Sequence, residues 1–130
     1  MLEALADKLQ SASVATVATD LFIGLMPSSP DDCIAIYEYA GSPPLEVLVD
    51  NDATLERPSV QVITRAGRND YPTARTLIEN ARNALTGITD ETISGVRFLR
   101  VNQISSINAL GVDDSDRPRF SLSLQIVVER

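Results

Sequence analysis

The chain has 130 residues, a formal net charge of −7 and a pI near 4.4. This length fits one domain with a two-layer core, and the acidity argues against a protein that wraps nucleic acid by neutralising phosphates. The single cysteine, Cys33, excludes an intrachain disulfide and a zinc-binding thiolate cluster, and it suits a reducing compartment. We expect a soluble domain that is not exported, because no signal-peptide pattern opens the chain and no apolar run reaches the ~20 residues that cross a bilayer.

The charges are divided unevenly along the chain. Residues 1–56 hold ten acids against one lysine, giving −9, whereas residues 57–130 hold ten arginines against eight acids, giving +2. In a monomer this asymmetry can be accidental. In a ring built head to tail, one face of each subunit must complement a different face of its neighbour, and such polarity would align the subunits. Arginine is also the cation that interfaces enrich.

The N-terminal half starts with an amphipathic pattern. Residues 2–13 place leucines on one stripe and predict a helix that lies on a core. Residues 14–32 end in a break rich in proline, serine and aspartate, and their periodicity does not separate a helix extension from a strand. Residues 33–39 carry apolar groups on both faces and predict an interior strand. Residues 45–54 form either a protruding hairpin or an irregular loop, and the pattern slightly favours the loop.

The next segments form the best-defined strand and helix. Residues 59–65 alternate as a strand, with Pro58 at its start, where a missing N–H costs little. Residues 72–87 repeat apolar groups with helical spacing and end at a glycine, and Asp70 or Tyr71 should cap the helix.

The C-terminal part adds two strands. After a polar connector at residues 88–95, residues 96–107 predict a long strand whose alternation breaks near Leu99, as a bulge would cause. A loop at 109–118 leads to a half-buried strand at 120–128. The fold class that follows is α+β: a single domain over residues 1–130, with a mixed, mainly antiparallel sheet of about four to five strands packed against two helices.

Catalytic and ligand-binding patterns are missing from the sequence. There is no histidine, so the commonest general base and metal ligand is absent, and Cys33 lies in an apolar strand as a core thiol. No glycine-rich phosphate loop is present. Asp113, Asp114 and Asp116 fail the EF-hand spacing and fit a solvated hairpin tip. We therefore expect no catalytic, cofactor-binding or metal-binding residues, and no enzyme.

Four segments carry a resemblance to a known family, and their order and spacing match it over most of the chain after residue 32. Together they resemble the tail terminator, or tail completion, proteins of long-tailed bacteriophages, often labelled minor capsid proteins. The segments are AIYEYAGSPP at 35–44, LERPSVQV at 55–62, DYPTAR at 70–75, and LGVDD through RPRFS at 110–121.

The resemblance implies a role in assembly and no catalysis. Such a protein forms a homo-oligomer, a hexameric ring on the finished tail tube, stops tube polymerisation and presents a surface for the head. The implied partners are the tail tube protein, the head-tail connector protein and DNA only in transit, with no membrane and no cofactor. The implied location is the virion, in the tail at the head-tail junction, after assembly in the host cytoplasm.

The resemblance also makes the loops around residues 45–57 and 113–119 candidates for contact with partners. An acid-lined ring would repel phosphate and let DNA slide, and Arg57 and Arg65 are expected to dock on an acidic neighbour. The full set of candidate interface residues is Glu46, Asp50, Asp52, Glu56, Arg57, Arg65, Arg68, Asp113, Asp114, Asp116, Arg117 and Arg119.

Three alternatives remain beside the tail terminator. A head-tail adaptor or minor capsid ring protein belongs to the same structural class. A small ligand-binding or regulatory α/β module comes next, and an enzyme comes last.

Overall fold

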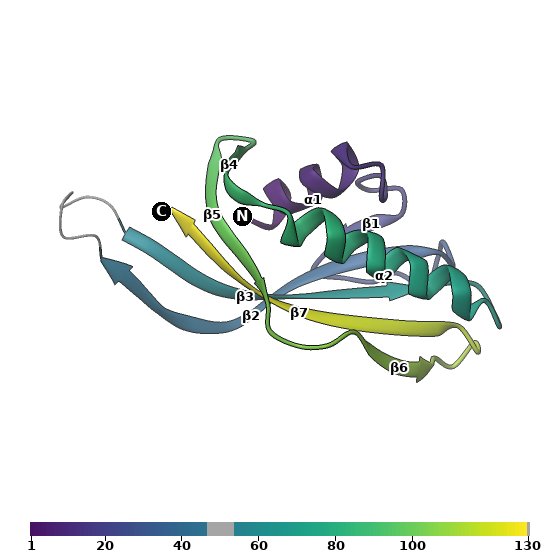
Figure 1. Cartoon of the computed structure of the whole chain (residues 1–130). Helices are drawn as coiled ribbons and strands as arrows, with labels where there is room; N and C mark the ends of the chain where they lie inside the picture. The colour runs from purple at the N-terminus through teal and green to yellow at the C-terminus, as the bar shows by residue number, and fades with distance from the viewer. Residues whose placement is uncertain (47–53, 130) are drawn as a thin grey trace.

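The computed structural model describes residues 1–46 and 54–129 and contains two helices and seven strands in them (Figure 1). The helices are α1 (Leu2–Ser11) and α2 (Tyr71–Thr86). The strands are β1 (Leu21–Ile23), β2 (Cys33–Glu46), β3 (Thr54–Arg65), β4 (Thr89–Ile93), β5 (Val96–Gln103), β6 (Asn108–Val112) and β7 (Pro118–Glu129). The predicted α+β class with two helices on a mixed sheet is confirmed.

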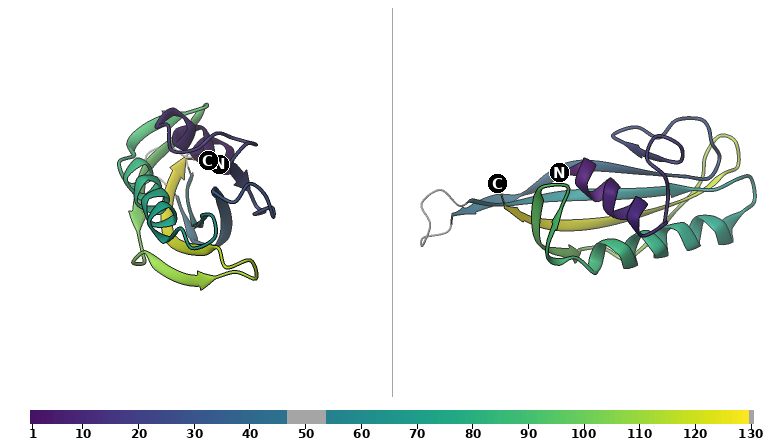
Figure 2. Two further views of the ribbon diagram at one scale, coloured as in Figure 1. Left: turned by 90° about the vertical axis from the view of Figure 1, so that its right-hand side faces the viewer. Right: turned by 90° about the horizontal axis from the view of Figure 1, so that it is seen from above.

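All seven strands form one sheet. Its order is β1-β2-β3-β7-β5-β4, and β6 pairs with β7 on the same side as β5. Only β1 and β2 run parallel; the other neighbours are antiparallel. The sheet curls, and both helices pack on one of its faces (Figure 2). The outer strands are therefore β1 on one edge and β4 and β6 on the other.

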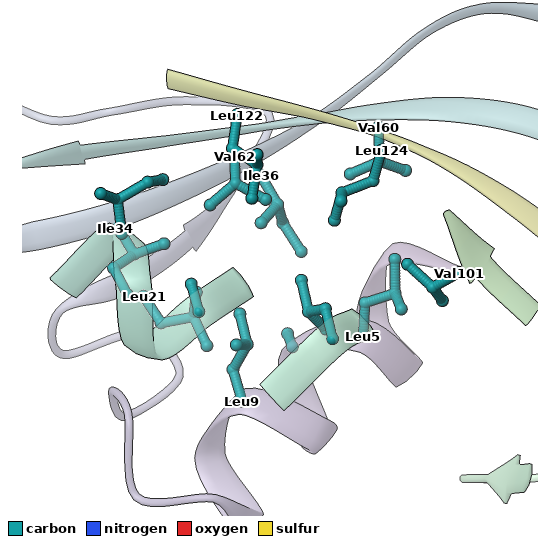
Figure 3. Close-up of a cluster of buried hydrophobic side chains, with 14 of the residues drawn as sticks. Leu5, Leu9, Leu21, Ile34, Ile36, Val60, Val62, Val101, Leu122 and Leu124 are labelled. Carbon is teal, nitrogen blue, oxygen red and sulfur yellow. The ribbon is translucent and has the colours of Figure 1, made fainter. Parts of the chain in front are cut away.

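The core fills the space between the helices and the inner face of the sheet. Helix α1 contributes Leu5 and Leu9, which are fully buried, and burial of each such side chain stabilises the fold by roughly 1.5–3 kcal/mol. Helix α2 contributes Ile78 and Leu85. Figure 3 shows the leucines of α1 pointing toward side chains from five strands: Leu21, Ile34, Ile36, Val60, Val62, Val101, Leu122 and Leu124.

The first helix contacts both edges of the curled sheet. It packs against β1 and β2 at one edge and against β4 at the other. The ammonium of Lys8 lies 2.9 Å from a carboxylate oxygen of Glu91 on β4, and the hydroxyl of Ser94 donates to Asp7 over 2.5 Å. These contacts join α1 to β4 and to the turn after it, 83 and 87 residues further along the chain.

Asp70 caps helix α2, and it is one of the two residues, Asp70 and Tyr71, predicted for this role. Its side chain accepts a hydrogen bond from the Thr73 N–H at 3.4 Å, and Pro72 occupies the first turn, where its missing N–H costs little. The helix ends at Thr86 with Gly87 following it.

The expected strand count of four to five is too low. The three additional strands are β1, inside the ambiguous stretch 14–32, β4, inside the connector 88–95, and β6, inside the loop 109–118. Each has five residues or fewer, and every residue of β6 is exposed. Strands β4 and β6 have no buried residue and β1 has one, Leu21, so no sustained alternation of apolar and polar residues marks these strands in the sequence.

Most of the segment at residues 45–54, for which the pattern slightly favours a loop over a hairpin, lies outside the described residues. Strand β2 continues to Glu46 and β3 begins at Thr54, so its described flanks are the arms of a hairpin and not a loop. Pro58 therefore lies inside β3, beside a register shift in the pairing with β2. A Cβ on Gly41 of β2 would lie 2.3 Å from the Arg57 carbonyl oxygen of β3, so only glycine fits where these two paired strands approach each other so closely.

Strand β5 confirms the predicted irregularity. Its pairing with β7 shifts register between Phe98 and Arg100, around Leu99. The strand ends at Gln103, four residues before the expected end.

Neither helix of the described residues has the length and apolar character that a membrane-spanning helix requires.

Candidate interaction surface

The predicted interface residues fall in two separate regions of the described chain. One region is the end of the sheet where β3 finishes and β7 begins, and the other is the pair of hairpin arms of β2 and β3. Asp50 and Asp52 lie outside the described residues. The sheet end holds Arg65, Arg68, Asp113, Asp114, Asp116, Arg117 and Arg119, and the hairpin arms hold Glu46, Glu56 and Arg57.

Arg65 lies inside the protein, which corrects its expected surface role. Only 4% of the residue is exposed. Its Nη2 donates to the carbonyl oxygens of Pro27 at 2.7 Å and Pro30 at 2.8 Å, and its Nε donates to that of Asp31 at 3.2 Å. The side chain thus fixes the loop at residues 27–31 against β3. Loss of oligomers in an Arg57→Glu, Arg65→Glu double variant would report on folding before it reported on docking.

Arg117 is a second arginine that holds the same loop. Its Nη1 donates to the Ser28 carbonyl oxygen at 2.6 Å and lies 3.2 Å from a carboxylate oxygen of Asp31. Its Nε donates to Asp113 at 2.8 Å. We call Arg65, Arg117 and residues 27–31 the clamped loop. Two of the predicted interface arginines are therefore structural ties within the chain.

Asp113 is built into the turn that carries Arg117. One carboxylate oxygen accepts the N–H groups of Ser115 at 2.9 Å and Arg117 at 3.0 Å, and the other accepts the Arg117 guanidinium. Desolvation raises the pKa of the Asp113 carboxyl, but these hydrogen bonds and the arginine charge together outweigh it, so the pKa lies below its usual 3.8.

The lowered pKa predicts how acid affects stability. A carboxyl whose pKa is depressed by folding stabilises the native state above its unfolded pKa, and that stability is lost as the pH falls through the folded value. We expect Asp113→Asn to lose less stability than the parent when the pH falls below about 3.8. Urea unfolding at pH 7, 4 and 3 measures this difference. Asp114→Asn, on the same turn, is the matched control, and equal acid sensitivity of the parent and Asp113→Asn would contradict the prediction.

The remaining charged groups of the sheet end lie closer to solvent. Arg68 and Asp116 form a pair at 3.3 Å whose side chains are 72% and 55% exposed. Asp114 is exposed on the same turn. Arg119 donates from Nη2 to the Val112 carbonyl oxygen at 3.5 Å, its buried Nε has no hydrogen-bond partner in the described chain, and no ion pair of the described residues includes it. Of the arginines at this end, Arg68 and Arg119 are the ones able to meet another molecule.

The hairpin arms place Glu56 and Arg57 in the ladder between β2 and β7. Arg57 is opposite Ser42, Glu56 is opposite Val128, and both are half-buried. Both also take part in interactions within the chain. Because they lie beside the close approach at Gly41, they help to hold β2, β3 and β7 together, and they also remain candidates for contact with partners.

The charge-based prediction missed a set of exposed apolar side chains. Large hydrophobic residues reach the surface beside β1 and beside β6, at the two outer edges of the sheet. For β1 the sequence carried a signal, the apolar run LFIGLM, which is longer than a three-residue strand needs. For β6 no comparable run exists.

Cys33 and the carboxylates do not form a chemical centre. The Cys33 thiol is buried, and desolvation raises its pKa despite the opposing charges of Arg65 and Arg117. Within residues 1–46 and 54–129, no group of three or more potential metal ligands converges.

The fold was compared with solved structures and the sequence with family models. A chain in the "Virion of native gene transfer agent (GTA) particle" superposes with a TM-score of 0.70, covering 100% of this chain and 95% of that one, at 16% identity. At this identity the likeness shows the fold alone, which is that of a virion component. A comparison with curated proteins gave no match.

The family model supplies the more specific result. A model described as "Bacteriophage tail terminator protein" matches residues 8–130. The chain therefore belongs to the bacteriophage tail terminator family, and the resemblance found in the sequence is confirmed. Its role is structural, in the assembly of a virion.

Proposed function

We propose that this chain assembles into a hexameric ring on the end of the phage tail tube, stops tube polymerisation and presents the surface to which the head attaches. It acts by docking and not by catalysis. Its partners are further copies of itself, the tail tube protein and the head-tail connector protein, and DNA passes through the ring. It assembles in the host cytoplasm and stays in the virion at the head-tail junction.

Membership of the tail terminator family over residues 8–130 carries this proposal. The charge asymmetry supports the ring, because residues 1–56 carry −9 and residues 57–130 carry +2. A closed ring joins two different faces of one subunit, so a chain with one acidic and one mildly basic part provides complementary faces. The fold likeness to a virion chain agrees with a structural role.

The proposal includes the passage of DNA. Acidic side chains facing the bore would repel phosphates and leave the duplex free to slide, whereas arginines would bind it. The acidic residues of the first 56 positions outnumber the one lysine there ten to one. An image of the ring with an arginine-lined bore would contradict this part of the proposal without affecting ring formation.

The experiment combines mass, image and tube length. Light scattering over a range of concentrations should find six copies, and electron microscopy should show a ring with a bore near the width of duplex DNA. When purified tail tube protein polymerises, addition of the chain should limit tube length and label one end of each tube, while a reaction without it should give long tubes. A ring that binds heads but leaves tube length unchanged would instead identify a head-tail adaptor. No binding to tubes or heads would overturn the proposal.

A further inference from the structure

The exposed large hydrophobic side chains lie on the two opposite edges of the curled sheet. Among the described residues they divide into two groups of four. On the side of β1 and β2 they are Val17, Ile23, Leu25 and Tyr39, and on the side of β6 they are Tyr71, Ile104, Leu110 and Val112. A soluble monomer rarely exposes large hydrophobic side chains close together, and a contiguous exposed apolar patch commonly marks an interface.

The first group is centred on β1. Val17 forms a bridge with Leu21, the first residue of β1, and Ile23 ends that strand. Leu25 follows and is 67% exposed. We call Val17, Ile23 and Leu25 the β1-edge patch. The outward backbone groups of Leu21 already have partners, since its N–H donates to Thr16 and its carbonyl accepts from Ala18. At this residue a partner would meet the edge through side chains.

Two members of the second group, Tyr71 and Val112, line a small cavity between β6 and the start of α2. The cavity has a volume of about 90 Å³, and Tyr71, Val112, Pro118 and Phe120 contribute to its lining. Val112 is 55% exposed and Leu110 is 42% exposed. We call Tyr71, Leu110 and Val112 the β6-edge patch. Strand β6 carries no charged residue and no proline, the usual protections of a free sheet edge.

The charges beside the two patches differ, because the β1 side is acidic and the β6 side is about neutral, with Arg119 as a cation outside any ion pair of the described residues. Arg119 lines the cavity of the β6-edge patch, and no carboxylate of the described residues pairs with it. On the neighbouring turn, Arg117 neutralises Asp113 and Arg68 neutralises Asp116, which leaves Asp114. In the sequence Asp20 lies between Val17 and Ile23 of the β1-edge patch, and the described residues from 9 to 46 contain no basic residue.

We propose that the β6-edge patch of one copy docks on the β1-edge patch of the next copy, so that Val112 and Leu110 face Leu25 and Ile23 across the subunit contact. This inference deepens the proposed function, on which it rests. The patches cannot cover each other within one chain, because β2, β3 and β7 separate their strands by about 19 Å along the sheet, four spacings of roughly 4.8 Å.

The occupant is a second copy because the two patches are different and complementary. A heterologous contact joins two unlike surfaces of the same chain and repeats until the rotation closes, which is what a ring needs. A two-fold dimer would need one self-complementary patch, and the acidic residues beside the β1-edge patch disfavour joining that patch to itself. Arg119 would lie against the acidic side of its neighbour.

Cysteine cross-linking tests the proposed contact. Cys33 is 1% exposed and its thiol pKa is raised by burial, so cysteines introduced at the surface are the reactive ones. We would prepare Leu25→Cys and Val112→Cys as single variants and as a double variant, and treat each with a short bismaleimide. Thr76→Cys, at an exposed position on the solvent side of α2, is the matched control.

The expected pattern is specific to a head-to-tail contact. The double variant should give a ladder that ends at the closed oligomer, and an equal mixture of the two single variants should give dimers and nothing larger. Each single variant alone, and Leu25→Cys mixed with Thr76→Cys, should stay monomeric on a denaturing gel. A mixture of Leu25→Cys and Val112→Cys without dimers, or dimers of one single variant alone, would overturn the proposed contact.

A second measurement separates this inference from the proposed function. Light scattering would compare the parent with Leu25→Asp, Val112→Asp and the control Thr76→Asp, after circular dichroism has established that each is folded. We expect at least a tenfold weaker association for the two patch variants and no change for the control. If the parent forms rings and the patch variants form them equally well, the contact lies elsewhere while the proposed ring stands. If the parent forms no ring alone or on tubes, both fail.

Discussion

Replacing Arg65 with alanine is expected to lower the free energy of unfolding by about 3 kcal/mol. Hydrogen bonds to a charged group contribute roughly 1.5–3 kcal/mol each, and loss of the charge also removes the cost of burying it, so the sum of three bonds is not reached. The variant leaves the carbonyl oxygens of Pro27, Pro30 and Asp31 without the arginine donor. The free energy of unfolding of Arg65→Lys should fall between those of the parent and Arg65→Ala, because one ammonium does not reproduce the planar fork of a guanidinium.

Urea unfolding followed by circular dichroism measures this change. Arg68→Ala is the matched control, since that side chain is 72% exposed and an exposed ion pair contributes up to about 1 kcal/mol. If Arg65→Ala cost no more than Arg68→Ala, the clamped loop would not depend on Arg65 and the internal role assigned to this arginine would be wrong.

Phe120→Ala should have an effect of similar or larger size, about 3–5 kcal/mol, as truncation of a fully buried phenylalanine leaves a cavity. The ring of Phe120 is 1% exposed, meets Tyr71 edge-on with centroids 5.0 Å apart, and has the Arg75 guanidinium 5.7 Å from its centroid. It therefore connects the first turn of α2 to β7. The loss should be read from thermal and urea unfolding.

Two variants keep the Phe120 prediction testable if the alanine variant does not fold. Phe120→Leu retains most of the volume and should cost about 1.5 kcal/mol or less. Tyr71→Ala removes only the edge-on partner, which is 55% exposed, and should cost less than Phe120→Ala. Equal losses for Phe120→Ala and Phe120→Leu would show that the site collapses around a smaller side chain.

The parts of the fold with a buried face could be predicted from the sequence. Residues 59–65 and 120–128 alternate because one side faces the core, and the helix at 72–87 repeats because one stripe does. Strands β4 and β6 could not be found this way, since neither has a run of buried residues. Hydrogen bonding to β5 and β7 makes them strands, and that depends on residues elsewhere in the chain.

The candidate interaction surface could also be predicted only in part from the sequence. The family resemblance made the loop at residues 113–119 a candidate, but neither the resemblance nor the charge pattern could tell a docking arginine from a structural one. Arg65 and Arg119 occupy equivalent positions on neighbouring strands, yet the first is surrounded by carbonyl oxygens of a loop about 35 residues earlier in the sequence. Only the return of that loop over the sheet separates their roles. The exposed apolar residues were harder to predict, because nothing in the sequence distinguishes an isolated exposed leucine from a core leucine.

The contacts of α1 with both edges of the sheet have a consequence for the geometry of the proposed ring. With Lys8 tied to Glu91 on β4 and Leu9 buried beside β1, the helix acts as a strap across the open side of the curl. The curl sets the angle between the β1 edge and the β6 edge, and in a closed ring that angle fixes how many copies complete a turn. The copy number would then be determined inside the subunit, by ten residues at its N-terminus that need not touch a neighbour at all.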